Sequence, residues 1–411
     1  KNRLVQIRAL VASVAVITND EPRPLSLPEA VLIAQDANEP SSSVFDARAD
    51  ALERQGAAAD TLPDPVFSAG IANVPLSDLD PNREPMTQAR IGVRQMFPRG
   101  DTRRLTREQR TAEARVMQAS REMNDRQIIL SVREAWLEIF YLDQSEALTR
   151  ERLAVVQDLE EVALSAYSAG RNNSHDVTRA DLEESILEAR LIDIERSRDQ
   201  ALADLSRFVT LAVARRPLPD VLPILPSVPE RDVALERLAG HPMIQSHNAR
   251  IEARELGIDL ALQEYRPAWS LEAGYGLRGS RSDIASIGVS VQMPLFGRDR
   301  QDETVASARD LRRAAELERA ATLMDMAQRL ERELAQLDRL DETARLYEGT
   351  VLPRARDTAE SVLLAYQNEG ADFAELVRSE LALLDAQLTL LRIEVDALQA
   401  QSRILYLAGD F

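Results

Sequence analysis

The sequence contains 411 residues, and only 4% of them are aromatic, so we do not expect a large compact core. Ala, Leu, Glu, Arg and Asp dominate, which is the composition of long helices and coiled coils. A net charge of −18 makes nucleic acid a poor partner, and the absence of cysteine excludes disulfides, thiolate metal sites and a catalytic thiol from this sequence.

Residues 1–24 pair basic side chains with a short apolar run that Arg8 interrupts. We interpret this segment either as the remnant of an export signal or as a frayed N-terminal segment. Farther along, no apolar run reaches the ~18 to 20 residues that a membrane-spanning helix needs. We therefore expect no transmembrane helix.

Short helical patterns flanked by prolines open both halves of the chain, at 27–40 and 228–242. In each half a second helical pattern follows and ends near Pro65 or Pro267. We interpret these four segments as helices that precede the strands, with those of the first half forming a group of equatorial helices.

Strand pairs are predicted at about 65–97 and 267–294, because apolar and polar residues alternate there. Strands of about ten residues with this alternation fit a half-buried soluble sheet. They fit the wall of a transmembrane barrel equally well, with apolar side chains toward lipid and polar ones toward the lumen. In the barrel, the candidates for lipid contact are Ile91, Val93, Trp269, Tyr275, Ile287 and Val289.

Each strand pair leads into a long charged segment through nearly the same phrase. The first copy, "IGVRQMFPRGD", covers 91–101, and the second, "IGVSVQMPLFGRD", covers 287–299. A phrase that recurs after about half the chain indicates an internal duplication. We interpret four of its residues as the strand-to-helix junctions: Pro98, Gly100, Pro294 and Gly297.

Long helical hairpins are predicted at about 99–213 and 298–408. Residues 101–169 contain neither Gly nor Pro, and a continuous helix there would extend roughly 100 Å at ~1.5 Å per residue. In the second hairpin, Gly349 and Pro353 are the only helix breakers before the turn. The returning helices carry coiled-coil seams, which are Leu187, Leu191, Ile194, Arg198, Ala201, Leu205 and Phe208, and then Leu381, Leu384, Leu388, Leu391, Val395, Leu398, Ser402 and Leu405.

The two halves therefore read as structural repeats, at 25–214 and 230–411, with a proline-rich connector at 215–229 between them. Around the turns, the sequences of the two halves align without a gap at one constant offset. Tyr167, for example, aligns with Tyr366. Shared helical composition does not readily explain such matches.

The number of strands bears on assembly if the sheet lies in a membrane. Hydrocarbon does not tolerate unpaired strand edges, so the sheet must then be closed, and four strands cannot close. Several chains must share one barrel. Two chains would give eight strands and an interior filled by side chains, whereas three would give twelve strands and leave a lumen.

With these features the sequence resembles the TolC-like outer membrane factors, and within them the heavy-metal efflux branch typified by CusC and CzcC. The resemblance spans roughly 25–408 and is carried by the strand-to-helix phrases and by two turn segments, "AYSAGRNNSHDVTRADL" at 166–182 and "VLPRARDTAESVLLAYQNEGADFAELVRSEL" at 351–381. It implies a mainly α fold with a membrane β-barrel, in which a trimer closes twelve strands and continues them as a periplasmic tunnel of helical hairpins.

The resemblance also implies a function. Such a chain would be the outer-membrane channel of a tripartite efflux system in a Gram-negative bacterium, with a long periplasmic extension. It would act as a passive exit duct for substrates, heavy-metal cations among them. The implied partners are a periplasmic adaptor (membrane fusion protein) and an inner-membrane RND-type pump, in addition to outer-membrane lipid.

The turns of the hairpins are the gate candidates that the family implies, because contacts between them close its periplasmic end. Where some members have a basic residue after the tip glycine, this chain has Ala371 and Asp372, so we do not expect a tyrosine–arginine lock. Asp176 also suits a helix N-cap, and both tyrosines suit packing. The candidates are Tyr167, Gly170, Asp176, Tyr366, Glu369, Gly370, Asp372 and Glu375.

Enzymatic activity has almost no support. His175, His241 and His247 are the only histidines, and there is no HExxH spacing, glycine-rich phosphate loop or nucleophile elbow. We expect no catalytic residue, no metal site and no cofactor. The alternative to a channel is a periplasmic coiled-coil adaptor or structural protein with a soluble β-sheet, and a dependence on detergent would distinguish the two.

Overall fold

The structure is a computed structural model that describes residues 23–37, 39–76, 80, 84–168, 174–279, 281–295, 297–368 and 370–409. These residues form two compact units, and each unit draws on both halves of the sequence. The hairpin unit comprises the described parts of Lys1–Ala37, Ile128–Pro226 and Ala335–Arg403. The sheet unit comprises those of Asn38–Gln127, Ser227–Leu334 and Ile404–Phe411. The division of the sequence into two repeats stays a prediction.

The fold class is the one predicted, mainly helical with four antiparallel strands. Among the described residues, no helix combines the length and apolar character needed to cross a membrane. The longest helix, α4 (Thr102–Ser168), has 67 residues, and like α9 (Gly297–Leu346) and α11 (Phe373–Ala408) it contributes to both units.

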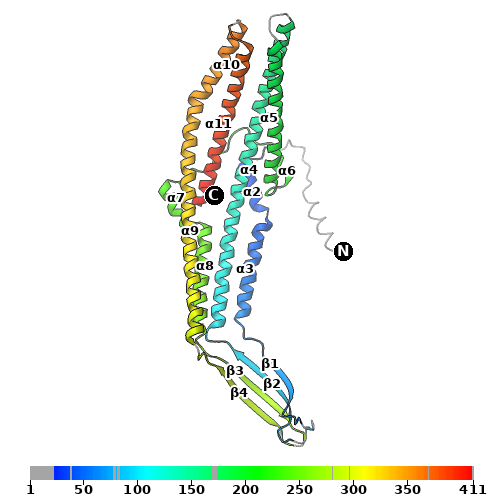
Figure 1. Ribbon diagram of the computed structural model, residues 1–411, viewed down its shortest axis with the longest axis vertical. Helices are drawn as coiled ribbons and strands as arrows, with labels where there is room; N and C mark the ends of the chain where they lie inside the picture. Colours follow the sequence, from blue (N-terminus) through cyan, green and yellow to red (C-terminus); the bar gives the residue numbers. More distant parts are fainter. Residues whose placement is uncertain are drawn as a thin grey trace. The chain divides into compact units, whose positions relative to one another are not determined.

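The hairpin unit contains two antiparallel helix pairs, which Figure 1 shows side by side. One pair is α4 with α5 (Ser174–Ser206), and the other is α10 (Leu352–Gln367) with α11. Two short helices, α2 (Leu27–Asp36) and α6 (Leu211–Ala214), also belong to the unit.

The core of the hairpin unit lies where α2, α4, α5 and α11 meet. Trp136 of α4 is 1% exposed, and its indole nitrogen donates to the backbone oxygen of Leu25 over 2.9 Å. Of the predicted seam residues, Leu187, Leu205 and Val395 are buried, whereas Phe208 lies beyond the end of α5. Burying side chains of this size stabilises by about 1.5–3 kcal/mol each.

A π-helical turn, η2 (Tyr347–Val351), separates α9 from α10 at the predicted helix breakers. Pro353 has no N–H to donate to the backbone oxygen of Gly349, so the regular α-helical hydrogen bond is lost at this point. One wider turn lets the helix continue beyond the lost bond.

The sheet unit holds the four strands and the helices beside them. Strands β1 (Val66–Ala72), β2 (Gln88–Phe97), β3 (Ala268–Leu277) and β4 (Ile284–Gln292) form one antiparallel sheet in the order β1-β2-β3-β4. The central β2–β3 pair joins the two halves of the sequence, with Ile91 opposite Tyr275. Strands β1 and β4 are the edges.

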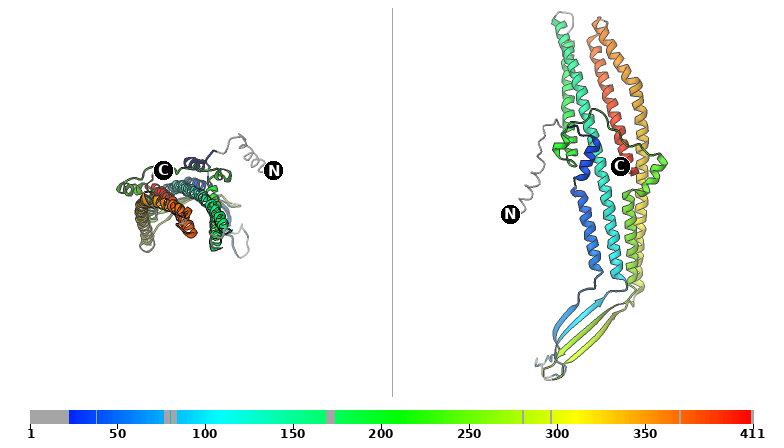
Figure 2. Two further views of the ribbon diagram at one scale, coloured as in Figure 1. Left: turned by 90° about the horizontal axis from the view of Figure 1, so that it is seen from above. Right: turned by 180° about the vertical axis from the view of Figure 1, so that it is seen from behind.

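Helix pairs adjoin the sheet in the same unit, and Figure 2 shows α3 (Pro40–Ala59) beside α4 and α8 (Pro242–Gln263) beside α9. Both α3 and α8 begin with proline, whose fixed φ suits the first turn of a helix. Two shorter elements, α7 (Arg231–Arg237) and the 3₁₀ helix η1 (Leu238–Gly240), precede α8.

His241 caps α8, because its Nδ1 accepts from the backbone N–H of Met243 over 3.2 Å. The His241 ring also meets Tyr406, near the end of α11, edge to face with centroids 5.3 Å apart. The histidine is 1% exposed. Burial first, and then the positive charge of Arg126, lowers the pKa of His241 to about 4.

Candidate functional site

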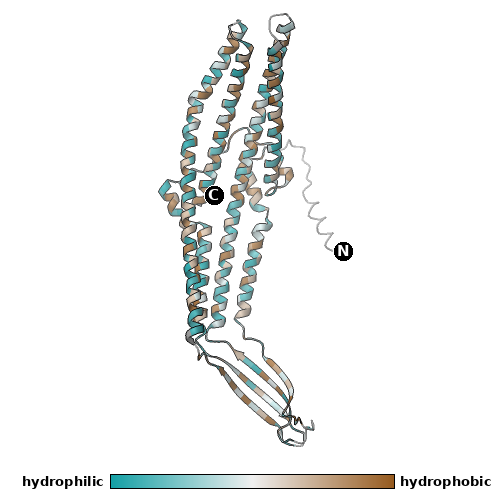
Figure 3. Cartoon of the chain, viewed as in Figure 1, coloured by the Kyte–Doolittle hydropathy of each residue, from teal (hydrophilic) through white to brown (hydrophobic). Residues whose placement is uncertain are grey.

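The sheet has one apolar and one polar face, as the alternation predicted. Residues directly opposite one another share a face, so the registers Val93–Ala273 and Ala273–Ile287 place these side chains together. Figure 3 shows the alternating hydropathy along the strands. The apolar face comprises Phe67, Ala69, Ile71, Ala89, Ile91, Val93, Phe97, Trp269, Leu271, Ala273, Tyr275, Leu277, Ala285, Ile287, Val289 and Val291, and the register also places the polar Gln95 on it.

The apolar face is open to its surroundings in the single chain. The side chains of Phe67, Ile71 and Ile287 are 78%, 71% and 83% exposed. Near one end of the face, Phe97 of β2 stacks on Trp269 of β3 with ring centroids 4.0 Å apart. All six residues predicted to contact lipid lie on this face, whereas their contact with lipid stays a prediction.

The polar face carries the charged residues of the strands. Arg94 of β2 forms an ion pair with Glu272 of β3. Arg90 extends toward β4, where its Nη2 lies 3.5 Å from the Oγ of Ser286. This face comprises Ser68, Gly70, Gln88, Arg90, Gly92, Arg94, Ser270, Glu272, Gly274, Gly276, Ser286, Gly288, Ser290 and Gln292, together with the apolar Val66, Ala72, Met96, Ala268 and Ile284 near the strand ends.

The first strand-to-helix junction explains the repeated Pro and Gly. Strand β2 ends at Phe97, directly before Pro98, and Gly100 has a φ of +43°. Any side chain there would be strained and would collide with the side chains of Gln263 and Arg266. The same Gln263 accepts from the backbone N–H of Asp101 over 3.1 Å and so fixes the start of α4.

The second junction is simpler. Strand β4 ends at Gln292, Pro294 follows, and Gly297 is the first residue of α9.

A cavity of about 650 Å³ lies in the sheet unit beside the first junction, and its lining includes Pro98, Thr102 and Gln263. The role of these residues as junctions stays a prediction about function.

The ends of the two helical hairpins share one apolar cluster. Ala163 of α4 and Ala180 of α5 are buried together with Phe373 and Leu376 of α11. Tyr366 of α10 packs on this cluster and meets Phe373 edge to face, with centroids 6.2 Å apart. The structure therefore brings the two predicted tips together, although Gly170 and Glu369 lie outside the described residues.

Tyr366 and Tyr167 differ in their surroundings. Tyr366 packs on the apolar cluster, and its role at a gate stays a prediction. Tyr167 is 49% exposed near the end of α4. Exposure at this level leaves its phenol open to other molecules.

The acidic candidates at the tips hold different positions. The N-cap role considered for Asp176 is wrong, because α5 begins at Ser174 and places Asp176 within the first turn, 3.3 Å from the Nε2 of His175. Asp372 caps a different helix, α11, since its Oδ1 accepts from the backbone N–H of Glu375 over 2.6 Å. Gly370 closes the turn by donating to Ala365 over 2.8 Å.

An acidic pair that the sequence did not suggest lies on the first hairpin. Glu160 of α4 shares a hydrogen bond with Glu184 of α5, and this bond is the main cause that raises the pKa of Glu160. Gln157 donates to the same Glu184 over 2.8 Å. Only an antiparallel pairing of α4 with α5 brings these side chains together.

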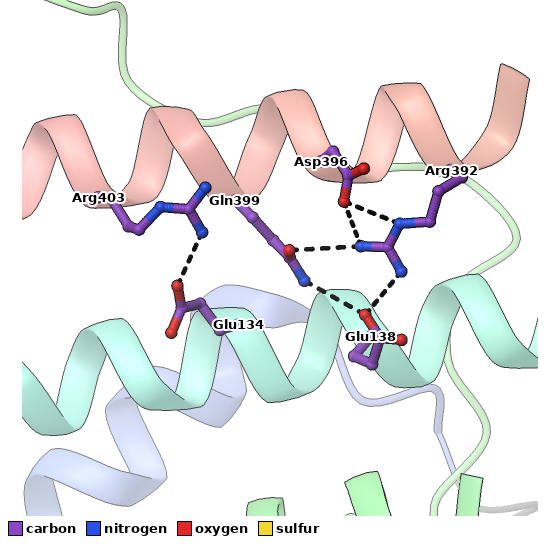
Figure 4. A network of polar contacts seen from close by, with 6 residues as sticks. All are labelled: Glu134, Glu138, Arg392, Asp396, Gln399 and Arg403. Carbon is purple, nitrogen blue, oxygen red and sulfur yellow. Dashed lines mark hydrogen bonds and ion pairs between the residues drawn. The ribbon is translucent and has the colours of Figure 1, made fainter. Parts of the chain in front are cut away.

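A polar network links α4 to α11, and thus the first hairpin to the second (Figure 4). Arg392 of α11 pairs with Glu138 of α4 over 2.8 Å and also with Asp396. Gln399 lies between them, 3.3 Å from Arg392 and 3.4 Å from Glu138. One turn away, Arg403 pairs with Glu134 over 3.0 Å.

The link continues toward the tips as a buried ion pair. Arg152 of α4 pairs with Glu380 of α11, and their side chains are 8% and 10% exposed. Sequence reasoning missed these contacts, because they require the register between helices of different halves. Within the described part of the chain, no group of three or more His, Cys, Asp or Glu could hold a metal ion.

Comparisons with known proteins agree with this geometry. Residues 42–209 match the family model described as outer membrane efflux protein. No curated protein sequence matches the chain. The fold matches that of TolC-like channels in solved structures over nearly the whole chain.

Three of these solved structures illustrate the match. The outer membrane protein VceC from Vibrio cholerae has a TM-score of 0.78 and 19% identity, over 93% of this chain and 96% of that one. The outer membrane channel CmeC from Campylobacter jejuni has a TM-score of 0.78 and 13% identity, over 93% and 85%. The structure of CusC has a TM-score of 0.77 and 14% identity, over 97% and 96%. The comparison does not single out the CusC and CzcC branch.

Proposed function

We propose that this chain belongs to the outer membrane efflux protein family and is one subunit of a trimeric duct through the outer membrane of a Gram-negative bacterium. The match of residues 42–209 to that family supports the proposal, and so does the fold shared with solved outer-membrane channels. The duct is passive, so its mechanism consists of gating and electrostatics.

The observation that carries the proposal is the exposed apolar face of a sheet with two open edges. Side chains such as Phe67 and Ile287 are more than three-quarters exposed in the single chain, and lipid is the environment that suits them. In lipid the free edges of β1 and β4 must pair. Pairing β4 of one copy with β1 of the next closes a barrel of twelve strands when three copies join, which leaves a lumen.

The helical hairpins then continue the duct into the periplasm. Three copies of the two hairpins give twelve helices around one axis. The tip residues Asp176, Asp372 and Glu375 would repeat threefold at the far end and form the gate. An inner-membrane RND-type pump and a periplasmic adaptor would deliver the substrate. Heavy-metal cations are the cargo that the resemblance suggests.

Mass measurement in detergent tests the assembly. We expect a trimer and no folded monomer, because a monomer would leave both strand edges and the apolar face exposed. A stable monomer that needs no detergent would contradict the duct and would favour the alternative, a periplasmic coiled-coil protein with a soluble sheet. Purified trimers should also conduct ions across a planar lipid bilayer.

A further inference from the structure

The polar face of the sheet contains one positive charge that no strand residue neutralises. Arg94 is paired with Glu272. The partner of Arg90 on the sheet is the neutral hydroxyl of Ser286, with 3.5 Å between Nη2 and Oγ. Within the described strands the charge of Arg90 is thus uncompensated, and its side chain is exposed.

Glycines of β3 determine how Arg90 lies on the sheet. A Cβ atom at Gly274 would come within 3.3 Å of the Nε of Arg90 and within 2.8 Å of the Oγ of Ser286. At Gly276 a Cβ would collide with the side chain of Gln88. The side chains of Gln88 and Arg90 therefore lie flat across β3. They occupy space that a side chain at Gly276 or Gly274 would fill.

We propose that Arg90 determines the ionic preference of the membrane segment of the duct. Three copies of Arg90 form a ring that attracts anions. The ring lies against the barrel wall because Gly274 has no side chain there. This inference rests on the proposed trimeric barrel, in which the polar face points into the lumen. The flat position keeps the guanidinium groups out of the permeation path. Their field still acts on ions within about one Debye length, ~10 Å at 0.1 M salt.

The charge is tested in planar bilayers under a potassium chloride gradient. At 0.1 M salt, the permeability ratio of chloride to potassium should be about twofold lower in Arg90→Gln than in the wild type. At 1 M salt the two proteins should have the same ratio, because screening removes the effect of the charge. Arg90→Lys should behave as wild type. The matched control is the double variant Arg94→Gln/Glu272→Gln, which removes a neutral pair from the same face and should leave the ratio unchanged.

The flat position is tested separately at 1 M salt, where the unitary conductance reports the width of the lumen. Gly274→Ala should lower the conductance, because the added methyl group pushes Arg90 away from the wall. The double variant Arg90→Ser/Gly274→Ala should restore it. Arg90→Ser alone also serves as a second neutral variant if Arg90→Gln does not assemble.

The outcomes separate this inference from the proposed function. Conducting trimers whose permeability ratio is the same in the wild type, Arg90→Gln and Arg90→Ser would overturn the role of Arg90 and leave the duct intact. Wild-type trimers that do not conduct at all would overturn the duct itself. A ratio that changes equally in the Arg94→Gln/Glu272→Gln control would also overturn the assignment to Arg90.

Discussion

At the scale of single residues, environment decides what similar side chains do. His241, His247 and His175 were indistinguishable in the sequence, yet His241 is 1% exposed whereas the side chain of His175 is 72% exposed. The two faces of the sheet were predictable residue by residue, because a strand alternates with period two. The position of Asp176 was not, since it depends on where α5 begins, and that helix begins at Ser174.

His241 makes the fold sensitive to acid. Its pKa is about 4 in the folded protein and has an ordinary value of 6.5. The unfolded chain therefore binds a proton first, and stability falls as the pH drops from about 6.5 toward 4, by up to about 3 kcal/mol. In His241→Asn, which keeps an N-cap acceptor, the fall in melting temperature between pH 7.5 and pH 5 should be smaller than in the wild type. An equal fall in both proteins would contradict this role.

The two faces of the sheet should differ in their tolerance of charge. Arginine in place of Ile91 or Val289 should hinder membrane insertion by ~2–4 kcal/mol at mid-membrane. Arginine at Ser290 should be mild, because Ser290 lies on the polar face beside Ser270. The yield of heat-resistant trimers in outer-membrane fractions measures the difference. Equal tolerance at all three positions would support a soluble sheet.

At the scale of elements, the strands and the hairpins were predictable from local pattern, whereas their lateral contacts were not. Alternation and prolines located β1 to β4, and Gly370 located the turn of the second hairpin. The pairing of Glu138 with Arg392 joins residues 254 positions apart and depends on the register of α4 against α11. Local periodicity carries no information about such a register.

The buried pair of Arg152 and Glu380 should behave as a unit. Removing one partner, as in Glu380→Gln or Arg152→Met, leaves a buried charge uncompensated and should cost ~3–5 kcal/mol in the free energy of unfolding. The double variant Arg152→Met/Glu380→Leu should recover most of that loss. Denaturant unfolding of the wild type, Arg152→Met, Glu380→Leu and the double variant closes the cycle. A loss in the double variant equal to the sum of the single losses would mean that the pair is not coupled.

An exposed pair provides the matched control for this cycle. Arg339 and Glu342 are one turn apart on α9, with side chains 80% and 65% exposed. Solvent screens such a pair, so Arg339→Met should change stability by less than ~0.5 kcal/mol.

At the scale of the whole molecule, the number of strands was the most informative prediction from the sequence. Four strands with an apolar face and two open edges imply association, whichever residues line the lumen. The substrate, in contrast, could not be inferred, because a duct of the proposed kind would contact its cargo through few residues.

The acids at the tips should act only in the assembled trimer, where threefold repetition concentrates them. In planar bilayers, Asp372→Asn/Glu375→Gln should reduce the preference for cations and weaken block by multivalent cations, with a smaller effect at high salt. Asp372→Ser is the necessary control, because serine removes the charge and can still accept from the backbone of Glu375. Unchanged selectivity in intact trimers would place the constriction elsewhere.

The open edges of the sheet have a genetic consequence. If β4 of each copy pairs with β1 of the next, one copy with an edge that cannot pair, such as a β1 with proline on its free side, interrupts the whole ring. If this variant is co-expressed with an equal amount of normal protein, each position in a trimer is normal half of the time. Only about one in eight trimers would then contain three normal chains. Such an allele should be dominant, and the loss of export should exceed the loss of gene dose.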